Sequence, residues 1–404
     1  MLRKLFSTGV ASSAVVLAST FFAQAQEPVK IGLMEDLSSI FVDIVGPGAV
    51  SAVEYAIEDF GGEVLGRPIE LLVADHHLDP AQAAAIATEW LSEDNVSLIT
   101  GVASSAGSIA VRQITREQGK LDIMSSGGTS ILTNEQCSPT GFHWTWDSYM
   151  MVRSTAERVV EDGGKKWFFL SLDTPFGTAS EAAATAFVKA SGGEVVGSVK
   201  VRQASSDMSS FLLQAQASGA DVIGMAIAGA DFINGVRQAS EFGVTPTQSL
   251  AALVTFISDV HDLGLQVAQG MYISLPFYWD TNEETRKWSK RFMEKHGVMP
   301  TSLQVGLYSG VYHYLKSVEA AGTTDAEAVA AKMRELPIND FWTENATIRE
   351  DGRVLRPAHL YRVKSPEDSA GDWDLLEYVS TLPAEKAAQP IENTKCPYLV
   401  NAAD

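Results

Sequence analysis

The strongest constraint on the fold is a regular alternation of short apolar runs with longer amphipathic runs. In the segment 48–62, Val50, Val53, Ile57 and Phe60 recur near helical spacing, and the segment closes on two glycines that suit a helix C-cap. Strand-like runs at 29–35, 68–75, 96–101 and 121–125 alternate with helix-like runs at 48–62, 80–93 and 105–118. This order predicts a parallel sheet covered by helices.

The same alternation begins again after residue 165. Strands are expected at 166–173, 194–201, 221–229 and 249–254, with helices at 177–191, 207–218 and 231–242. Two further helices, 283–296 and 302–321, are too few to build a third domain, and we expect them to return to the first sheet. The chain would then cross between two lobes near 145, near 276 and again near 345–355.

We therefore predict an α/β fold of two doubly wound parallel-sheet lobes joined by a three-segment hinge. Lobe one would comprise 26–145 plus 277–345, lobe two 146–276 plus 346–385, and 386–404 would form a C-terminal tail. In such sheets ligands bind at the carboxyl ends of the strands, so the cleft between the lobes is the expected site.

The N-terminus indicates export. Arg3 and Lys4 precede an apolar stretch, and Ala23-Gln24-Ala25 has the small-x-small pattern of a cleavage site, so residues 1–25 are predicted to be a signal peptide. A retained membrane anchor is the alternative, but the stretch is short and broken by Ser and Thr. No cysteine stands directly after the cleavage site, so a lipoprotein is not indicated.

The chain is strongly acidic, with a formal net charge of −20. Such a surface repels nucleic acid and anionic lipid, so no nucleic-acid partner is expected. The sequence has two cysteines, Cys137 and Cys396. In an oxidising compartment this single pair predicts one disulfide, which would tie the C-terminal tail to lobe one; two free thiols are the alternative.

The segment "SSGGTS" at 125–130 follows a predicted buried strand and presents hydroxyls and backbone amides. Such groups at a strand end or helix N-terminus suit an anion, because they donate hydrogen bonds within a favourable dipole. The alternative is that Ser and Thr here, and in "GVASSAGS" at 101–108, serve only as helix caps or turn residues.

Enzyme motifs are weak in this chain. "VGPGAVS" resembles a dinucleotide-binding turn, but about ten residues separate it from the first strand, whereas a phosphate turn follows its strand at once. No G-x-S-x-G or H-E-x-x-H motif occurs, and adjacent His76 and His77 would point to opposite faces. We predict no enzymatic activity, no metal and no cofactor.

The ordered set of "KIGLMEDLSS", "GPGAVSAVEYAIEDFGG", "VSLITGVASSAGSIAV", "IMSSGGTSILT", "HWTWDSY", "SLDTPFGTA" and "AQGMYISLPFYWD" resembles the periplasmic type I solute-binding proteins of the leucine/isoleucine/valine-binding family. The resemblance covers essentially the whole mature chain. It implies a periplasmic, monomeric receptor that closes on a small ligand and delivers it to an inner-membrane permease of an ABC importer.

The resemblance also implies which residues bind the ligand. Its carboxylate would be held by Ser105, with neighbouring Ser104, and by Gly128 and Thr129. Phe176 stands where a tyrosine is common and would form an aromatic wall; core packing is the alternative. Phe41 and Val42 fall in a first loop that contacts ligand in this family.

One departure bears on the ligand. Members that bind amino acids place an acid against the ligand's ammonium group in the stretch that reads Leu253 to Phe256 here. A buried ammonium without a carboxylate is costly, so we expect a non-amino carboxylate, aromatic ones included; a branched-chain or other amino acid or amide is the alternative. Asp231 could supply the missing acid or simply cap a helix, and Tyr278 beside the hinge could bind or only pack. A sensing domain that docks on a membrane receptor is the alternative of another class.

Overall fold

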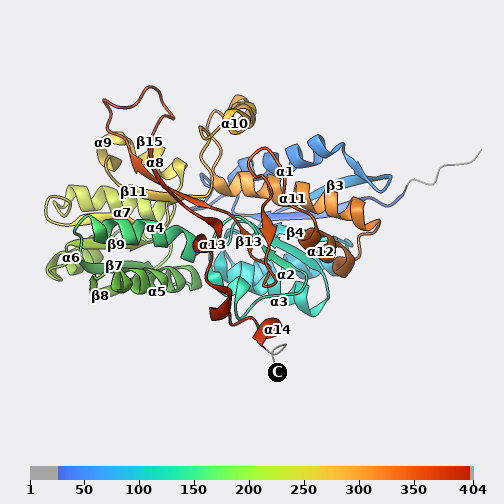
Figure 1. Ribbon diagram of the computed structural model, residues 1–404, viewed down its shortest axis with the longest axis horizontal. Coiled ribbons are helices and arrows are strands. Elements are labelled where there is room, and N and C mark those ends of the chain that lie inside the picture. Colours follow the sequence, from blue (N-terminus) through green and yellow to red (C-terminus); the bar gives the residue numbers. More distant parts are fainter. Residues whose placement is uncertain (1–25, 401–404) are drawn as a thin grey trace, which may run out of the picture.

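The computed structural model describes residues 26–400, so the predicted signal peptide at 1–25 lies outside the described residues. Two α/β lobes lie side by side, with lobe one on the right of Figure 1 and lobe two on the left. Both contain a predominantly parallel sheet, so the fold class predicted from the alternation is confirmed. No helix of this described part is both long and apolar enough to cross a membrane.

The sheet of lobe one has six strands. Its order is β2 (Glu63–Val64), β3 (Arg67–Asp75), β1 (Val29–Glu35), β4 (Leu98–Gly101), β5 (Leu121–Met124) and β6 (Gly141–His143). All neighbours pair in parallel except β2, which forms an antiparallel hairpin with β3. Six of the seven residues of β1 are buried, as expected for a central strand with both faces covered by helices.

Local sequence signals begin and end the helices of lobe one. These are α1 (Gly46–Phe60), α2 (Pro80–Ser92), α3 (Ser105–Glu117), α10 (Glu283–His296), α11 (Ser302–Ala321) and α12 (Ala326–Glu335), with a short 3-10 helix η1 (Ser130–Thr133). The Asp79 carboxylate caps α2 by accepting from the amide of Ala81 at 2.8 Å. Gly61 ends α1 with φ of 115°, a left-handed conformation that glycine adopts without steric cost.

Lobe two repeats the pattern with a four-stranded parallel sheet. Its order is β10 (Ser249–Ala252), β9 (Val222–Ala226), β7 (Lys166–Leu172) and β8 (Glu194–Val201). The helices are α4 (Ser148–Glu161), α5 (Pro175–Ala190), α6 (Ser209–Ala217), α7 (Ala230–Glu241), α8 (Ile257–Leu263) and α9 (Leu265–Ala268).

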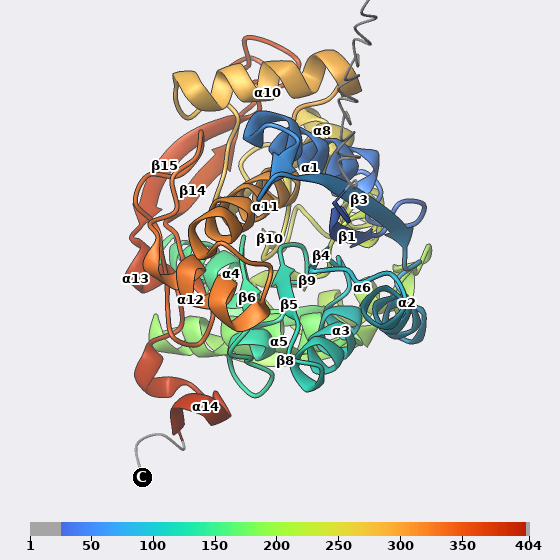
Figure 2. The ribbon, with the colours of Figure 1, turned by 90° about the vertical axis from the view of Figure 1, so that its right-hand side faces the viewer.

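The last third of the chain joins the lobes. After β11 (Tyr272–Leu275) the chain returns to lobe one, where α10 and α11 both contact α1 (Figure 2). It then forms a hairpin of β12 (Thr347–Ile348) and β13 (Val354–Leu355). Arg353, just before β13, forms an isolated parallel β-bridge with His143, the last residue of β6 in the sheet of lobe one. Strands β14 (Ala358–Val363) and β15 (Leu376–Leu382) complete an antiparallel sheet with β11 that packs on α4. The sequence patterns did not predict this third sheet, nor α4.

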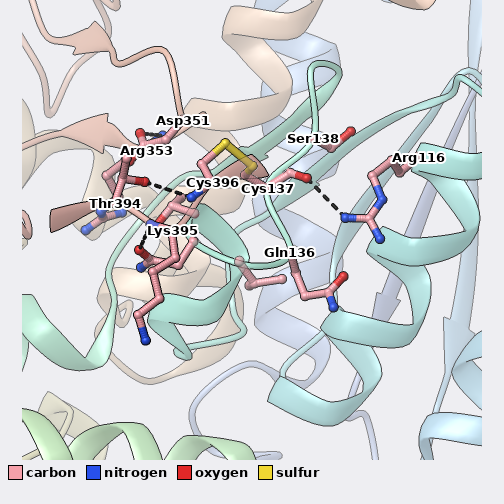
Figure 3. The surroundings of a disulfide bond; sticks show 12 residues. Arg116, Gln136, Cys137, Ser138, Asp351, Arg353, Thr394, Lys395 and Cys396 are labelled. Carbon is pink, nitrogen blue, oxygen red and sulfur yellow. Dashed lines mark hydrogen bonds between the residues drawn. A yellow bond between two sulfur atoms is a disulfide. The ribbon is translucent and has the colours of Figure 1, made fainter. Parts of the chain in front are cut away.

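The C-terminal tail contains α13 (Ala384–Ala387), η2 (Ile391–Asn393) and α14 (Pro397–Val400). The predicted disulfide between Cys137 and Cys396 is present and holds this tail against lobe one (Figure 3). Hydrogen bonds on both sides support the bridge: Arg116 donates to the carbonyl of Cys137 at 3.2 Å, and the amide of Lys395 donates to Asn134 at 3.0 Å.

Candidate ligand-binding site

A cavity of about 220 Å³ lies between the lobes at the carboxyl ends of both parallel sheets. Loops that follow β1, β3, β4, β5 and β6 form one side, and loops that follow β7, β8, β9 and β10 form the other. Its lining residues are Phe41, Ile44, Leu78, Pro80, Ala103, Ser104, Ser105, Ala106, Ser126, Gly128, Trp146, Leu172, Asp173, Thr174, Pro175, Phe176, Gln203, Ala228, Phe256 and Leu303.

The N-terminus of α3 opens on this cavity from lobe one. Ser104 is the N-cap, and its hydroxyl accepts from the amide of Gly107 at 3.2 Å. Ser105 and Ala106 are the first two helical residues, and both line the cavity. Amides in the first turn of a helix have no partner within the helix, so this end of α3 offers donors and a positive dipole.

The N-terminus of α5 opens on the same cavity from lobe two. Thr174 caps this helix by accepting from the amide of Gly177 at 3.2 Å, and Pro175 and Phe176 follow as its first residues. Helices α3 and α5 contact each other across the lobes. The positive ends of two helix dipoles therefore converge on one small space, which favours an anionic group there.

Aromatic rings form the apolar part of the cavity. The ring of Trp146 lies edge to face with Phe176 at a centroid distance of 6.1 Å and with Phe256 at 5.6 Å. Gly128 lies against Trp146 so closely that a Cβ atom on it would lie 2.5 Å from Cζ2 of the indole. The absence of a side chain at Gly128 thus lets the indole ring pack directly against the backbone, and both residues line the cavity.

The cavity carries little charge. None of the described residues that line it is a Lys, Arg or His. Among the same residues, the one carboxylate belongs to Asp173, which is exposed and directly follows β7. An anion would therefore be held by hydroxyls, amides and helix dipoles rather than by a cation. Across residues 26–400, no group of His, Cys, Asp and Glu has an arrangement that could hold a metal ion.

The carboxyl of Glu35 lies directly behind this wall and is fully buried. Its Oε2 accepts from the amide of Ala103 at 3.0 Å, and its Oε1 shares a hydrogen bond with the hydroxyl of Ser126. Burial is the main reason that the pKa of Glu35 rises from 4.5 to about 8, and the nearby charge of Asp36 adds to the increase.

Five of the predicted site residues line the cavity together: Phe41, Ser104, Ser105, Gly128 and Phe176. They come from four loops that are distant in sequence. The sequence left open whether the serines of this loop only cap a helix. Ser104 is the N-cap of α3, whereas Ser105 is the first residue of the helix.

Four predicted site residues are not brought to the cavity lining. Thr129 is fully buried, and its hydroxyl accepts from the amide of Ile131 at 3.4 Å to begin η1. Val42 faces a separate interlobe cavity of about 250 Å³. Asp231 is buried and accepts from the amide of Ala204 at 2.9 Å, while the hydroxyl of Tyr278 donates to the carbonyl of Trp373 at 3.3 Å.

Sequence reasoning missed Ser126, Trp146, Asp173 and Gln203, which all line the cavity. Asp173 directly follows β7 and Gln203 is the second residue after β8, so a position at or just beyond a strand end was a usable signal. Trp146 lies where the chain first crosses between the lobes, and only the tertiary arrangement turns its ring toward Gly128.

The lobes are closed on each other in this structure. The amide of Ala230 in lobe two donates to the carbonyl of Ile40 in lobe one at 3.3 Å. A Cβ atom on Gly229 would lie 2.6 Å from that same carbonyl oxygen, so this glycine permits the close approach. The cavity is thus bounded by both lobes at once.

Two hinged parallel-sheet lobes that close on a small cavity at their strand ends define a two-lobed ligand-binding protein, whose ligands bind in the cleft. The model of the periplasmic binding protein family matches residues 28–371. The chain therefore belongs to the periplasmic binding protein family, whose members bind solutes and are not enzymes.

Individual relatives agree with this assignment. A periplasmic binding protein from Burkholderia mallei is 41% identical, with a TM-score of 0.91, over 92% of this chain and 99% of that one. A branched chain amino acid ABC transporter periplasmic ligand-binding protein from Burkholderia xenovorans is 36% identical, with a TM-score of 0.80, over 91% and 99% of the two chains. A Leu/Ile/Val-binding protein homolog from Brucella melitensis is 22% identical over 80% of this chain and 82% of its own. This chain is thus similar over nearly its whole length to the solute-binding component of an ABC transporter.

Proposed function

We propose that this protein captures a small amphipathic carboxylate in the interlobe cavity, and that an apolar α-amino acid is the first candidate. The observation that carries the proposal is the convergence of the N-termini of α3 and α5 on one cavity with an aromatic wall. The helix ends suit the carboxylate, and Phe41, Trp146 and Phe176 suit an apolar side chain.

Two observations favour an amino acid over a ligand without an ammonium group. The Burkholderia xenovorans relative, at 36% identity, is a branched-chain amino acid transport protein. In addition, Asp173 places a carboxylate at the cavity from the end of β7. This position differs from the stretch Leu253 to Phe256, where the family resemblance implies an acid in members that bind amino acids. The expected preference for non-amino carboxylates therefore becomes the second candidate.

The second candidate, an aromatic carboxylate without an amino group, rests on the character of the wall. One side of the cavity is enclosed by Trp146, Phe176 and Phe256. Phe256 belongs to the stretch in which amino-acid-binding relatives are expected to place an acid. Asp173 is exposed, so an ammonium group beside it would keep part of its hydration. That hydration lowers the desolvation cost of an ammonium group whose partner is imperfect, but it also weakens the attraction between the ammonium group and Asp173.

Matched ligand pairs separate the candidates. The protein is unfolded, stripped of bound ligand, refolded and titrated calorimetrically with leucine and 4-methylpentanoate, and with phenylalanine and 3-phenylpropanoate. Each pair differs only in the α-amino group. The first candidate predicts that the amino acid binds at least tenfold more tightly than its partner. Equal or tighter binding of the acid without an amino group supports the second candidate, and no binding of any of the four contradicts the proposed function.

A substitution tests the role of Asp173. Asp173→Asn should weaken amino-acid binding about tenfold, because a charge-assisted hydrogen bond is replaced by a neutral one, and should leave 4-methylpentanoate unaffected. Glu241→Gln is the matched control, since Glu241 is an exposed acid of the same lobe at the end of α7. Equal losses for both ligands would show that Asp173 has no contact with an ammonium group.

From the proposed role in transport we also infer a partner, an inner-membrane permease, and a location, the periplasm. The closed form would present a continuous surface of both lobes to an inner-membrane permease, and ligand stabilises that form only by binding it more tightly than the open form. We propose that the protein acts as a monomer in the periplasm after removal of the signal peptide.

A further inference from the structure

Glu35 is a buried acid, and within residues 26–400 no cationic side chain pairs with it. It ends β1, and its two oxygens contact the amide of Ala103 and the hydroxyl of Ser126, both of which belong to cavity-lining residues. Gly101 leaves room for it, since a Cβ atom there would lie 2.7 Å from Glu35 Oε1. The carboxyl is thus built into the wall of the cavity but does not itself line it.

The charged groups around Glu35 do not compensate a negative charge. Asp36 is adjacent in sequence, and Asp75 is its neighbour in register on β3. The side chain of His76, which follows β3, is kept neutral by burial, which lowers its pKa. From the side of α3 and β5, Arg112 is already paired with Asp122 at 2.7 Å. A buried carboxyl in this setting is more stable in its neutral form.

The protonation state of Glu35 decides which way the Ser126 hydroxyl points. The amide of Ala103 can only donate, so Oε2 must accept. A neutral Glu35 carries its proton on Oε1 and donates it to Ser126, which leaves the serine proton free to point into the cavity. An ionised Glu35 instead accepts the serine proton, so Ser126 turns only lone pairs toward the ligand.

We propose that Glu35 is a positioning residue whose neutral carboxyl makes Ser126 a hydrogen-bond donor to the ligand's carboxylate. This inference rests on the proposed function, since it requires a carboxylate in the cavity. It adds that ligand binding and protonation of Glu35 support each other. The transported anion is released more readily when that proton is lost, and its binding takes up a proton at alkaline pH.

The test uses the full mature protein and whichever of the four ligands binds most tightly in the paired titrations. Affinity is measured from pH 6 to pH 9.5 for the wild type, Glu35→Gln and Glu35→Ala. The wild type should bind about tenfold more weakly at pH 9 than at pH 7, because the pKa of Glu35 is raised to about 8 by burial. Glu35→Gln preserves the hydrogen-bond pattern of the neutral acid, so its pH profile should be flat, whereas Glu35→Ala should bind weakly throughout. Comparing variants at each pH cancels the titration of the ligand itself.

Two further measurements make the inference independent of one variant. Ser126→Ala should also flatten the profile while weakening binding at pH 7, because the hydroxyl that responds to Glu35 is gone. Asp259→Asn is the control for a second buried acid, whose pKa is raised by burial to about 7, and the decline between pH 7 and pH 9 should persist in it. The infrared difference spectrum of ligand-free wild type minus Glu35→Gln should show a protonated carboxyl at pH 7 that disappears above pH 9.

The outcomes separate the two proposals. If none of the four ligands binds at any pH, the proposed function fails. If a probe binds but the ratio of wild-type to Glu35→Gln affinity is constant with pH, the role of Glu35 is overturned while carboxylate binding stands. Affinity that rises with pH would also overturn it, because Ser126 would then serve a cationic group.

Discussion

A Cβ atom on Gly128 would lie 2.5 Å from Cζ2 of Trp146, so the glycine backbone and the indole ring form one surface of the cavity. Gly128 belongs to lobe one, and Trp146 lies at the first crossing between the lobes, where its ring also contacts Phe176 and Phe256 of lobe two. Any atom added at Gly128 must therefore displace a ring that joins the two lobes. The contact makes the shape of the site sensitive to a single methyl group.

We expect Gly128→Ala to weaken ligand binding at least tenfold, because overpacking of this kind costs about 1–3 kcal/mol and moves Trp146 into the cavity. Adding Trp146→Phe to the same chain should recover part of the loss, since the smaller ring lacks the clashing atoms. Calorimetric titration of the two single variants and the double variant measures this coupling. Gly371→Ala, where a Cβ atom would meet nothing within 4 Å, is the control. Strictly additive losses would contradict the packing argument.

Substitutions at Ser105 and Thr129 should have different effects, one on ligand affinity and the other on the stability of the fold. Ser105→Ala is expected to weaken binding by about 1–3 kcal/mol, because the removed hydroxyl faces the cavity at the start of α3. Thr129→Ala should instead lower the free energy of unfolding by about 0.5–2 kcal/mol, as loss of a helix cap does, and change the Kd less than twofold. Urea unfolding and calorimetry on both variants check this. A loss of affinity in Thr129→Ala equal to that in Ser105→Ala would show that the threonine hydroxyl reaches the ligand after all.

Removing the disulfide should affect stability far more than binding. The bridge between Cys137 and Cys396 closes a loop with a sequence separation of 259 residues, so it strongly restricts the unfolded chain. The double variant Cys137→Ser, Cys396→Ser should lose about 2–5 kcal/mol in the free energy of unfolding. Wild type treated with reductant should match it, and ligand affinity should change less than twofold, because neither cysteine lines the cavity. Equal midpoints in urea with and without the bridge would refute the expectation.

His313 should make the fold sensitive to acid. It is buried in α11, its Nε2 lies 2.9 Å from the carbonyl of Met333, and burial lowers its pKa from 6.5 to about 4. Between these two values the unfolded state binds more protons than the folded state. The contribution of His313 is therefore complete above pH 6.5 and is lost progressively toward pH 4, by up to about 3 kcal/mol.

Urea unfolding across this pH range measures the slope. His313→Gln, whose amide can still donate to Met333, should make the decline shallower, whereas substitution of the exposed His77 with Gln should not. An unchanged slope in His313→Gln would assign the acid sensitivity to other groups such as His143, which is also buried and has a pKa lowered by burial.

Much of the fold followed from local patterns. The helix 302–321 and the strand 29–35 were predicted with the bounds that the structure has, because their apolar spacing, caps and flanking residues all agree. The antiparallel sheet of β11, β14 and β15 was not predicted, because β11 is far from the other two strands in sequence, and β14 and β15 lie outside the βα alternation. Within the site, residues that directly follow strands were the easiest to anticipate.

The sequence by itself determined the two α/β repeats, the paired cysteines and the polar loops after the strands, because these depend on periodicity and on residues near each other in the chain. Only the tertiary structure decided which residue of each loop reaches the cavity. In "SSGGTS", Ser126 and Gly128 line it while Thr129 is turned into the core. Neighbouring residues of an extended segment point in opposite directions, so a shift of one position exchanges a ligand contact for a buried cap. The same is true of Glu35, whose role depends on being packed behind Ser126, 91 residues away in the chain.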